Sequence, residues 1–274
     1  MEPVRPEFVP DPALSREEME ALQRDIAAAA TFDDDFDFDP DAVGVASAID
    51  PDLSVEDADQ TRFGGRDEDR EPPIVAGVDQ AFLDDEAVSA VVAVRDGAVV
   101  ERTYAVEPLS IPYIPGLLSF REGGPILSAF ETLAVEPDLV LFDGSGRIHF
   151  RQAGIATHLG VVLDVPSVGV AKSLLCGRPR SSVDGLQSGE RVAVEADGRV
   201  EGTEGAVIGY AVQTKQYPSS RRVNPVYVSS GHRVGAESAA AFALALAAGY
   251  KLPEPIRLAD RYVGEVRDGL ESDR

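Results

Sequence analysis

Three carboxylates in this 274-residue chain could together hold a divalent cation. Asp79 interrupts an apolar run, Asp143 ends another, and Glu122 lies between them. A carboxylate among apolar residues is costly to bury unless its charge is offset, and metal coordination does so directly. Taken singly, each could instead cap a turn, compensate a helix dipole or form an Asp-Gly turn. As a set, these oxygen ligands predict a Mg²⁺ site, in which Mn²⁺ could substitute.

The apolar pattern predicts elements that would bring the three carboxylates together. Strands are expected over 74–81, 87–94 and 98–107, joined by short turns into an antiparallel meander. The elements expected next are a helix to 135 from about 124, or from as early as 119, a strand over 138–142, a helix over 151–163, a strand over 166–171, a β-rich stretch over 190–230 and a helix over 235–249.

This order of elements is that of an α/β, ribonuclease H-like mixed sheet with helices on both faces. In that plan the first and fourth strands are neighbours, and the helix between them covers both. Asp79 and Asp143 would then lie side by side, with Glu122 near the start of the covering helix. The carboxyl ends of parallel strands are where ligands gather in open α/β sheets. The order of elements therefore supports a single metal site.

The chain before the sheet divides into two parts. Ser15 and Glu18 form a capping-box pattern that predicts a helix to about residue 30, so residues 1–31 are expected to be a helical segment packing on the main domain. Residues 32–71 are acidic and show no periodicity, which predicts a disordered insert. The main domain is expected to span 72–274.

The overall charge balance argues against a nucleic-acid partner. The chain has 25 basic and 48 acidic side chains, a net charge of −23, whereas phosphate binding normally depends on Lys and Arg. Residues 1–71 carry 6 basic and 22 acidic side chains (−16), and residues 72–274 carry 19 and 26 (−7). Residues 111–182 carry six of each. A neutral surface of this kind can still meet DNA.

The same composition predicts a protein that works in molar salt. There are 22 arginines and only three lysines, Lys172, Lys215 and Lys251, beside abundant Asp and Glu. Dense carboxylates hold water and cations, and high salt screens their mutual repulsion. An ordinary acidic protein with an acidic insert is the alternative.

The sequence contains no apolar run near 18 residues and no secretory pattern at its start, and Cys176 is its only cysteine. A cytoplasmic monomer without membrane contact is therefore expected, with no internal disulfide.

Five segments in order resemble the endonuclease V family. They are VAGVDQAF (75–82), PYIPGLLSFRE (112–122), DLVLFDGSGRIHFRQAGIATHLG (138–160), PSVGVAKSLL (166–175) and NPVYVSSGHRV (224–234). The resemblance covers most of 72–260, and the helix expected near 15–30 matches the family's leading helix. Two features depart from the pattern: the acidic insert, and Phe150, where the family usually has proline.

The resemblance implies a nuclease with a metal site. Asp79 and Asp143 look like direct metal ligands, and Glu122 looks like a ligand directly or through water. Lys172 looks like the cation that contacts the scissile phosphate or orients the attacking water. His232 looks like the fourth member of the site, as a metal ligand or a proton shuttle. On the residues alone, Lys172 could be a surface charge and His232 a packed loop histidine.

The resemblance also implies how the lesion is read. Pro112, Tyr113, Ile114 and Pro115 look like a wedge that enters the duplex as the altered base leaves the stack. The residues that match the family's base pocket are Leu118, Gly144 and Leu175. His158 is expected to be structural, and His149 lies beside the site in an undetermined role. Tyr113 could instead be an ordinary packed aromatic.

The implied activity is cleavage of DNA at a deaminated base such as hypoxanthine. The cut would fall at the second phosphodiester bond 3′ to the lesion and leave a 3′-hydroxyl and a 5′-phosphate. Two alternatives stay open: an endoribonuclease acting on inosine-containing RNA, and a non-catalytic nucleic-acid-binding module. The second is disfavoured by the intact set of Asp79, Glu122, Asp143, Lys172 and His232, because binding alone does not require these carboxylates beside phosphate.

Overall fold

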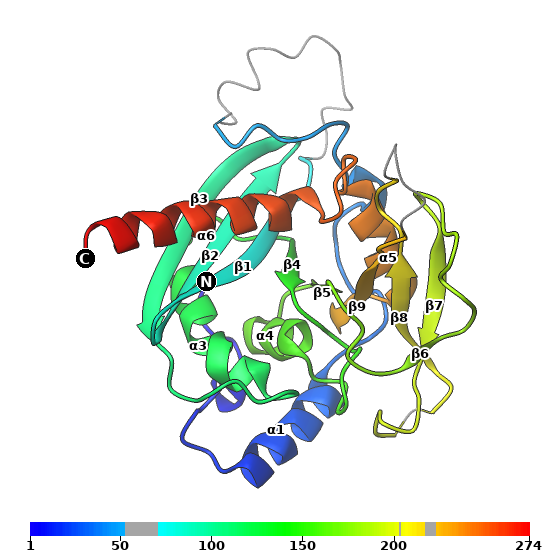
Figure 1. Ribbon diagram of the computed structural model, residues 1–274, viewed down its shortest axis with the longest axis horizontal. Helices are drawn as coiled ribbons and strands as arrows, with labels where there is room; N and C mark the ends of the chain where they lie inside the picture. The colour runs from blue at the N-terminus through cyan, green and yellow to red at the C-terminus, as the bar shows by residue number, and fades with distance from the viewer. Residues whose placement is uncertain (53–70, 203, 217–222) are drawn as a thin grey trace.

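One mixed sheet organises the chain (Figure 1). The computed structural model describes residues 1–52, 71–202, 204–216 and 223–274. Within these, nine strands follow the order β3-β2-β1-β4-β5-β9-β8-β7-β6. The strands are β1 Val75–Leu83, β2 Glu86–Arg95, β3 Ala98–Pro108, β4 Leu139–Asp143, β5 Ser167–Ala171, β6 Arg178–Pro179, β7 Arg191–Glu195, β8 Val207–Val212 and β9 Val226–His232. The helices are η1 Pro6–Phe8, α1 Arg16–Ala29, η2 Pro40–Ala42, α3 Leu118–Glu131, α4 Ile155–Leu163, α5 Ala236–Ala245 and α6 Glu254–Ser272.

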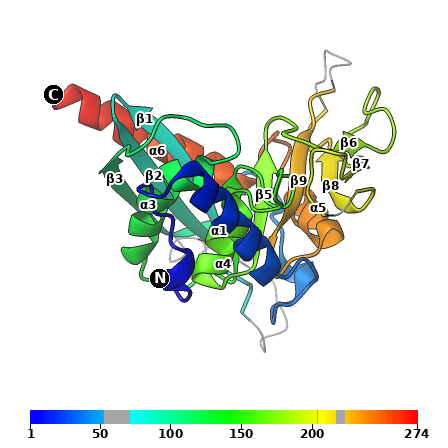
Figure 2. The ribbon, with the colours of Figure 1, turned by 90° about the horizontal axis from the view of Figure 1, so that it is seen from below.

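Helices cover both faces of the sheet, as predicted (Figures 1 and 2). Successive side chains of a strand point to opposite faces, so Val75 and Ala76 belong to different cores. Ala76 lies in the core beneath α3 and α4, while Val75 lies in the core beneath α5 and α6. The helix α1 packs outside α4, through Ile26 and Val161.

The strand directions define two edges of the sheet. Strands β1, β4 and β5 are parallel, and their ends form what we call the carboxyl edge. Val78 pairs with Phe142, so Asp79 and Asp143 come next on adjacent strands. Strand β9 is antiparallel to β5, with Tyr227 opposite Ala171. The start of β9 therefore lies at the carboxyl edge and its end lies at the opposite, amino edge.

The last helix, α6, is absent from the sequence prediction. Its apolar positions 256, 259, 263, 266 and 270 follow helical spacing, and Pro255 stands in its first turn, so a signal was present. A Cβ on Gly77 would lie 2.1 Å from the carbonyl carbon of Pro255. The start of α6 therefore rests directly on β1, two residues before Asp79.

The predicted disorder of 32–71 is wrong for residues 32–52, which we call the strap. Phe36 and Phe38 stack on one another with centroids 4.4 Å apart and pack against Phe242 of α5. Val43 and Ile49 are buried in the core beneath α5 and α6. Periodicity misses such a segment because its apolar residues are irregularly spaced. Residues 53–70 of the expected insert lie outside the described residues.

The strap also makes polar contacts with α5. Asp34 accepts hydrogen bonds from the backbone N–H of Gly235 and from the hydroxyl of Ser238, at 2.7 and 2.6 Å. It thereby caps the start of α5. No helix in the described parts of the chain could span a membrane.

Candidate active site

Four predicted site residues meet in one pocket at the carboxyl edge. Asp79 from β1, Glu122 from α3, Asp143 from β4 and Lys172 after β5 line a cavity of about 250 Å³. The parallel register of β1 and β4 places the two aspartates side by side, and α3 carries Glu122 above them. The predicted helix does start early, at Leu118, which puts Glu122 in its second turn.

The two aspartates lie side by side next to one cationic side chain, Lys172. Burial raises the pKa of Asp79 to about 8, and the negative charge of Asp143 contributes to the rise. Lys172 Nζ lies 2.6 Å from Asp143 Oδ2. Burial alone would lower the pKa of Lys172, but the carboxylate of Asp143 raises it overall. Lys172 therefore stays charged and remains half-exposed, where a phosphate could reach it.

Glu122 is a third carboxylate that burial makes hard to ionise. Burial raises its pKa to about 7, against the opposing charge of Arg121. Arg121 Nη1 donates to Glu122 Oε1 at 3.0 Å, and the guanidinium stacks 4.5 Å from the ring centroid of Phe82. Nearby, Gln80 donates from Nε2 to the backbone carbonyl of Glu122 at 3.0 Å. Both neighbours fix the position of Glu122.

A fourth carboxylate, Asp260, was missed by the sequence reasoning. It comes from α6 and lies close enough to Asp79 to add to the rise in the pKa of Asp79, which burial causes in the first place. Nothing in the five recognised segments includes it. Only the amphipathic spacing of α6 could have indicated that a carboxylate there faces β1.

The expectation that His232 completes this site is wrong. His232 is the last residue of β9 and pairs with Ser167, the first residue of β5, so it lies at the amino edge. Its Nε2 bonds Asp164 Oδ1 at 3.1 Å, and its Nδ1 accepts from the backbone N–H of Thr31 at 3.1 Å. Burial lowers its pKa. The β-rich stretch expected over 190–230 includes most of β9, but the antiparallel direction of β9 takes its end away from the carboxylates.

The donor set fits a hard divalent cation. Every candidate ligand in the pocket is a carboxylate oxygen. The raised pKa of Asp79 reflects its burial and then the negative charge of Asp143, and a cation would offset both. Gln80 Oε1, on a residue that lines the same pocket, is buried with no hydrogen-bond partner in the described structure. Within the described residues, no three His, Cys, Asp or Glu side chains are already drawn together as a metal cage. The carboxylates instead contact Lys172, Arg121 and one another.

A second pocket adjoins the first. It has a volume of about 280 Å³, and all three residues predicted for the base pocket line it: Leu118, Gly144 and Leu175. Asp143, Lys172 and Ile155 line both pockets. A Cβ on Gly144 would lie 2.5 Å from Cγ2 of Ile155, so only glycine leaves this wall intact.

Tyr113 stands at the mouth of the second pocket. It is 64% exposed, whereas Ile114 packs into a small core with Met19, Leu117 and Phe120 beneath the loop. Pro112 and Pro115 on either side are exposed and fix the backbone torsions. Ile114 therefore anchors the loop against α1, while Tyr113 points into the solvent.

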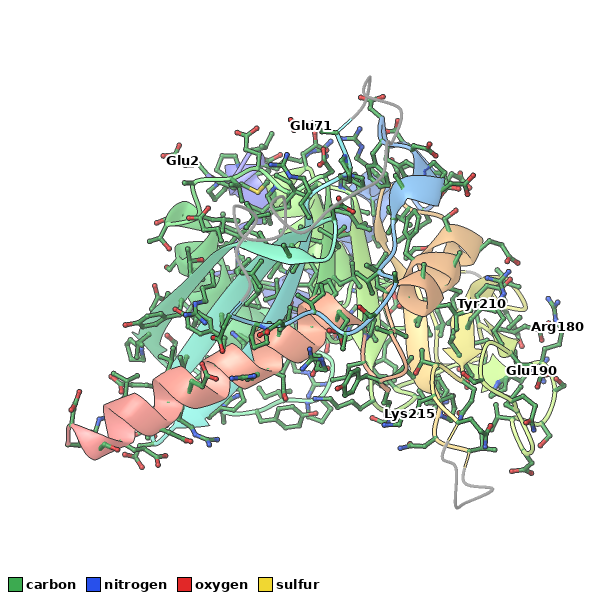
Figure 3. The ribbon with its side chains drawn as sticks, turned by 90° about the horizontal axis from the view of Figure 1, so that it is seen from above. Glu2, Glu71, Arg180, Glu190, Tyr210 and Lys215 are labelled. Atoms are coloured by element: carbon green, nitrogen blue, oxygen red, sulfur yellow. The ribbon has the colours of Figure 1, made fainter. Side chains whose placement is uncertain are left out.

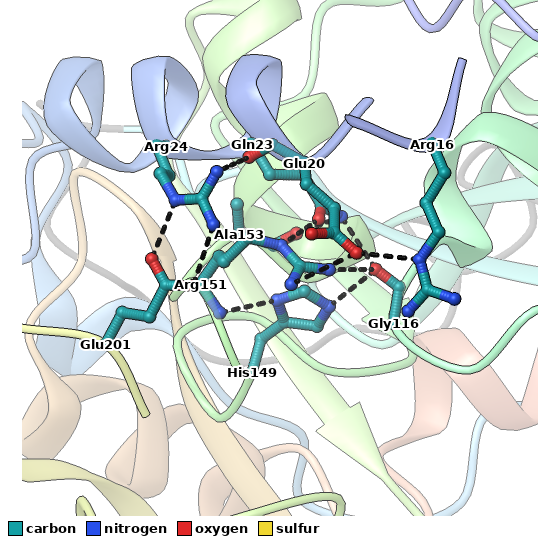
Figure 4. A network of polar contacts seen from close by, with 9 residues as sticks. All are labelled: Arg16, Glu20, Gln23, Arg24, Gly116, His149, Arg151, Ala153 and Glu201. Atoms are coloured by element: carbon teal, nitrogen blue, oxygen red, sulfur yellow. Dashed lines mark hydrogen bonds and ion pairs between the residues drawn. The ribbon is translucent and has the colours of Figure 1, made fainter. Parts of the chain in front are cut away.

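A polar network fixes the end of this loop at Gly116 (Figure 4). The carbonyl of Gly116 accepts from Gln23 Nε2 at 2.9 Å and from His149 Nε2 at 3.1 Å. Arg151 Nε donates to Gln23 Oε1 at 2.7 Å, and its backbone N–H donates to His149 Nδ1 at 3.2 Å. Gly116 has φ +82°, which favours glycine. His149, whose role the sequence left undetermined, thus holds the loop that carries Tyr113.

The other buried histidine supports α3 from below. His158 Nδ1 bonds the Ser119 hydroxyl, and its Nε2 bonds the carbonyl of Phe8, both at 2.8 Å. Burial lowers the pKa of His158 to about 4, and burial with the charge of Arg151 does the same for His149. Both imidazoles are therefore neutral near pH 7. The contacts of His158 agree with its predicted structural role.

Comparison with known proteins gives a consistent result. The family model for Endonuclease V matches residues 60–261. The chain is 58% identical over 273 residues to Endonuclease V of the halophilic archaeon Haloarcula marismortui, with 98% of each chain covered. It is 29% identical to the crystal structure of the Endonuclease V from Streptomyces avermitilis, with a TM-score of 0.70 and 97% of each chain covered.

A further solved structure is that of Ciona intestinalis Endonuclease V in complex with a 24mer DNA containing an inosine followed by a ribo-adenosine. The chain is 23% identical to it, with a TM-score of 0.66, covering 93% of this chain and 98% of that one, and this likeness concerns the fold alone. Endonuclease V structures have a ribonuclease H-like fold, so the predicted fold class is confirmed. The predicted halophilic origin is confirmed by the Haloarcula relative.

Proposed function

Because this chain belongs to the endonuclease V family of metal-dependent endonucleases, we propose that it repairs DNA at deaminated bases. It recognises hypoxanthine in deoxyinosine and hydrolyses the second phosphodiester bond 3′ to it, leaving a 3′-hydroxyl and a 5′-phosphate. The observation that carries this proposal is the junction of the two pockets at Asp143 and Lys172. When the base is held in the second pocket, the DNA strand that carries it runs beside the carboxylates of the first pocket.

Lesion recognition follows from the second pocket and its mouth. Tyr113 fills the gap in the duplex as the base turns out, and the flanking prolines make its mount stiff. Leu118 and Leu175 offer apolar contacts to the base, and Gly144 lets the backbone approach it closely. The Ciona protein bound to inosine-containing DNA supports this choice of lesion.

Catalysis follows from the carboxylate pocket. Asp79 and Asp143 would bind Mg²⁺, or Mn²⁺ in its place, together with Asp260 and with Glu122 directly or through water. A cation held by these residues would make a bound water more acidic and would offset charge on the phosphate. Lys172 orients Asp143 and offers its ammonium to the scissile phosphate or the attacking water. Arg121 keeps Glu122 in place and favours its ionised form.

We place the enzyme in the cytoplasm, where the chromosome of an archaeal cell like that of its Haloarcula relative lies. We expect a monomer, because one chain supplies every side chain of both pockets.

The test is cleavage of a duplex with one deoxyinosine, with and without Mg²⁺, beside a matched normal duplex and an inosine-containing RNA. Cutting should require the lesion and Mg²⁺, and Asp143→Asn should lower the rate on the order of 10²–10³-fold or more. That variant should still bind the lesion, since it removes a charge beside phosphate. Near-normal cleavage by Asp143→Asn would exclude the proposed metal site. Faster cutting of RNA would assign the enzyme to RNA instead.

A further inference from the structure

The acidic residues of this chain avoid one part of the fold. With 48 acidic residues in 274, a stretch of 49 residues would hold about nine, yet residues 205–253 contain one, Glu237. This stretch supplies β8, β9 and α5. Glu237 itself forms an ion pair with Arg191 at 2.6 Å. These three elements therefore contribute a single acidic side chain between them.

The lysines, in contrast to the acidic residues, are concentrated in one place. All three lie at the carboxyl edge. Lys172 follows β5, and Lys215 follows the end of β8. The end of β8 pairs with the start of β9, which itself pairs with the end of β5. Lys251 joins them, since the Thr214 hydroxyl donates to its carbonyl at 2.6 Å. Figure 3 shows Lys215 on the opposite side of the molecule from Glu2 and Glu71.

Buried contacts hold Lys215 and Lys251 in place. Gln213 is only 1% exposed; its Nε2 donates to the carbonyl of Lys215 at 2.7 Å, and its Oε1 accepts from the backbone N–H of Asn224 at 3.1 Å. Lys251 Nζ donates to Asn224 Oδ1 at 3.0 Å. Tyr250, 40% exposed, has its ring centroid 5.5 Å from Lys215 Nζ. We call Lys215, Tyr250 and Lys251 the lysine strip.

Two carboxylates near the strip are engaged by their own neighbours. Glu190 precedes β7 and accepts from the backbone N–H of Gln187 at 2.8 Å. Glu254 is fully buried and paired with Arg257, which also stacks on the Tyr250 ring at 4.6 Å. Ammonium groups beside an aromatic ring, on a stretch of chain with only one acidic residue, fit a nucleic-acid backbone.

We propose that the lysine strip binds DNA phosphates outside the cleavage site, as a second contact with the substrate. This inference rests on the proposed function. The strands from β4 to β8 are three spacings apart, or about 14 Å, which is roughly four nucleotide steps of 3.4 Å. The strip therefore contacts the DNA backbone about four nucleotides from the scissile phosphate. It lies beyond Lys172 when the sheet is followed from Asp143.

The first test compares variants matched in charge. Lys215→Gln/Lys251→Gln removes the strip lysines, and Arg5→Gln/Arg95→Gln removes two charges toward the amino edge, where Arg5 contacts the end of α4 and Arg95 ends β2. Binding of a labelled deoxyinosine duplex is measured by anisotropy without divalent metal, across KCl concentrations. The strip variant should bind about ten-fold more weakly and lose nearly two units of slope in log K against log salt. Equal binding by both variants would overturn the proposal.

The second test removes DNA instead of protein charge. Duplexes are shortened from one end at a time, and the wild-type protein should lose affinity once one particular flank falls below about four nucleotides. The strip variant should show little further loss on the same series, because the contact is already absent. Equal losses in both proteins would overturn the proposal, since a merely structural role for the lysines predicts that result.

These outcomes separate the strip from the proposed activity. Wild-type protein that cleaves inosine DNA, with a strip variant that binds like its control, would disprove the strip alone. Wild-type protein that shows the flank dependence but never cleaves at inosine would disprove the proposed function and leave the strip as a nucleic-acid contact.

Discussion

The backbone N–H of Ile49 donates a 2.7 Å hydrogen bond to the carboxylate of Glu254, the first residue of α6. Glu254 is fully buried and also accepts two hydrogen bonds from Arg257, at 2.6 and 2.7 Å. Arg257 donates in turn to the carbonyl of Ile49 at 3.0 Å. The strap lies before residue 60, where the family match begins. It nevertheless forms hydrogen bonds with α6, the helix that places Asp260 beside Asp79.

Loss of Arg257 should destabilise the protein strongly. Arg257→Ala leaves a buried carboxylate without its partner, which costs about 3–5 kcal/mol in other proteins. The double variant Glu254→Gln/Arg257→Gln removes both charges and should lose less. Free energies of unfolding from denaturant titrations in high KCl give the comparison. If the double variant were the less stable of the two, the buried charge would not be the cause.

Asp260, and not His232, should govern metal binding. Asp260→Asn should raise the Mg²⁺ concentration needed for half-maximal cleavage by ten-fold or more, on the scale seen when groups around a metal are removed. It should also reduce the increase in melting temperature that Mg²⁺ produces. His232→Gln breaks contacts at the amino edge and should lower stability without changing the Mg²⁺ dependence. The reverse pattern would return His232 to the site.

Tyr113 should determine lesion discrimination. Tyr113→Ala removes the exposed ring, and the preference for inosine over normal duplex should fall by about 1–3 kcal/mol, the range of one stacking contact. Tyr104→Ala is the matched control, since Tyr104 is 45% exposed but lies on β3 against Tyr262. Competition binding with both duplexes measures the preference. Unchanged discrimination in Tyr113→Ala would make Tyr113 a packing residue.

Acid should destabilise the fold through its buried histidines. The pKa of His149 and of His158 is lowered to about 4 by burial, whereas an unfolded histidine titrates near 6.5. Between these values the unfolded chain binds protons that the folded one cannot. The free energy of unfolding is therefore unaffected by protonation of these histidines above about pH 6.5. It falls as the pH drops toward 4, by roughly 3 kcal/mol for each histidine.

The measurement is the free energy of unfolding from pH 7.5 to 5 for the wild type and for His158→Gln, in saturating Mg²⁺. The raised pKa values of Asp79 and Glu122 act in the opposite direction, but they are common to both proteins and cancel in the difference. His158→Gln should show a shallower loss of stability on acidification. Parallel curves would mean that His158 does not titrate on unfolding.

Salt should help this enzyme where it inhibits ordinary DNA-binding proteins. At a net charge of −23, protein and DNA repel each other, and the Debye length falls from about 10 Å at 0.1 M salt to about 3 Å at 1 M. Cleavage and thermal stability should therefore improve with KCl into the molar range. A cleavage optimum below about 0.2 M, the usual range for basic DNA binders, would contradict this expectation.

The sequence predicted those helices and strands that have a regular apolar pattern or a capping motif of their own. Alternation and apolar runs located β1 to β5, and the capping box at Ser15 located α1. The strap could not be predicted in this way, because its apolar residues are not regularly spaced. They pack instead against α5 and α6, some 200 residues later in the chain. The same limit applies to the site. The register of parallel strands brings Asp79 and Asp143 together, but only the packing of α6 on Gly77 shows that Asp260 joins them.

All three lysines lie at the carboxyl edge, where they offset part of the negative charge of Asp79, Glu122, Asp143 and Asp260. Glu2 and Glu71 lie on the side opposite Lys215, and Lys172 lies at the carboxyl edge (Figure 3). With a cation bound among these carboxylates, the carboxyl edge would be repelled less by a polyanion than the rest of the protein, which would favour encounters that bring this edge to DNA. In molar salt this electrostatic preference acts only within about 3 Å. The orientation is then selected on the DNA surface, during sliding, more than during the approach.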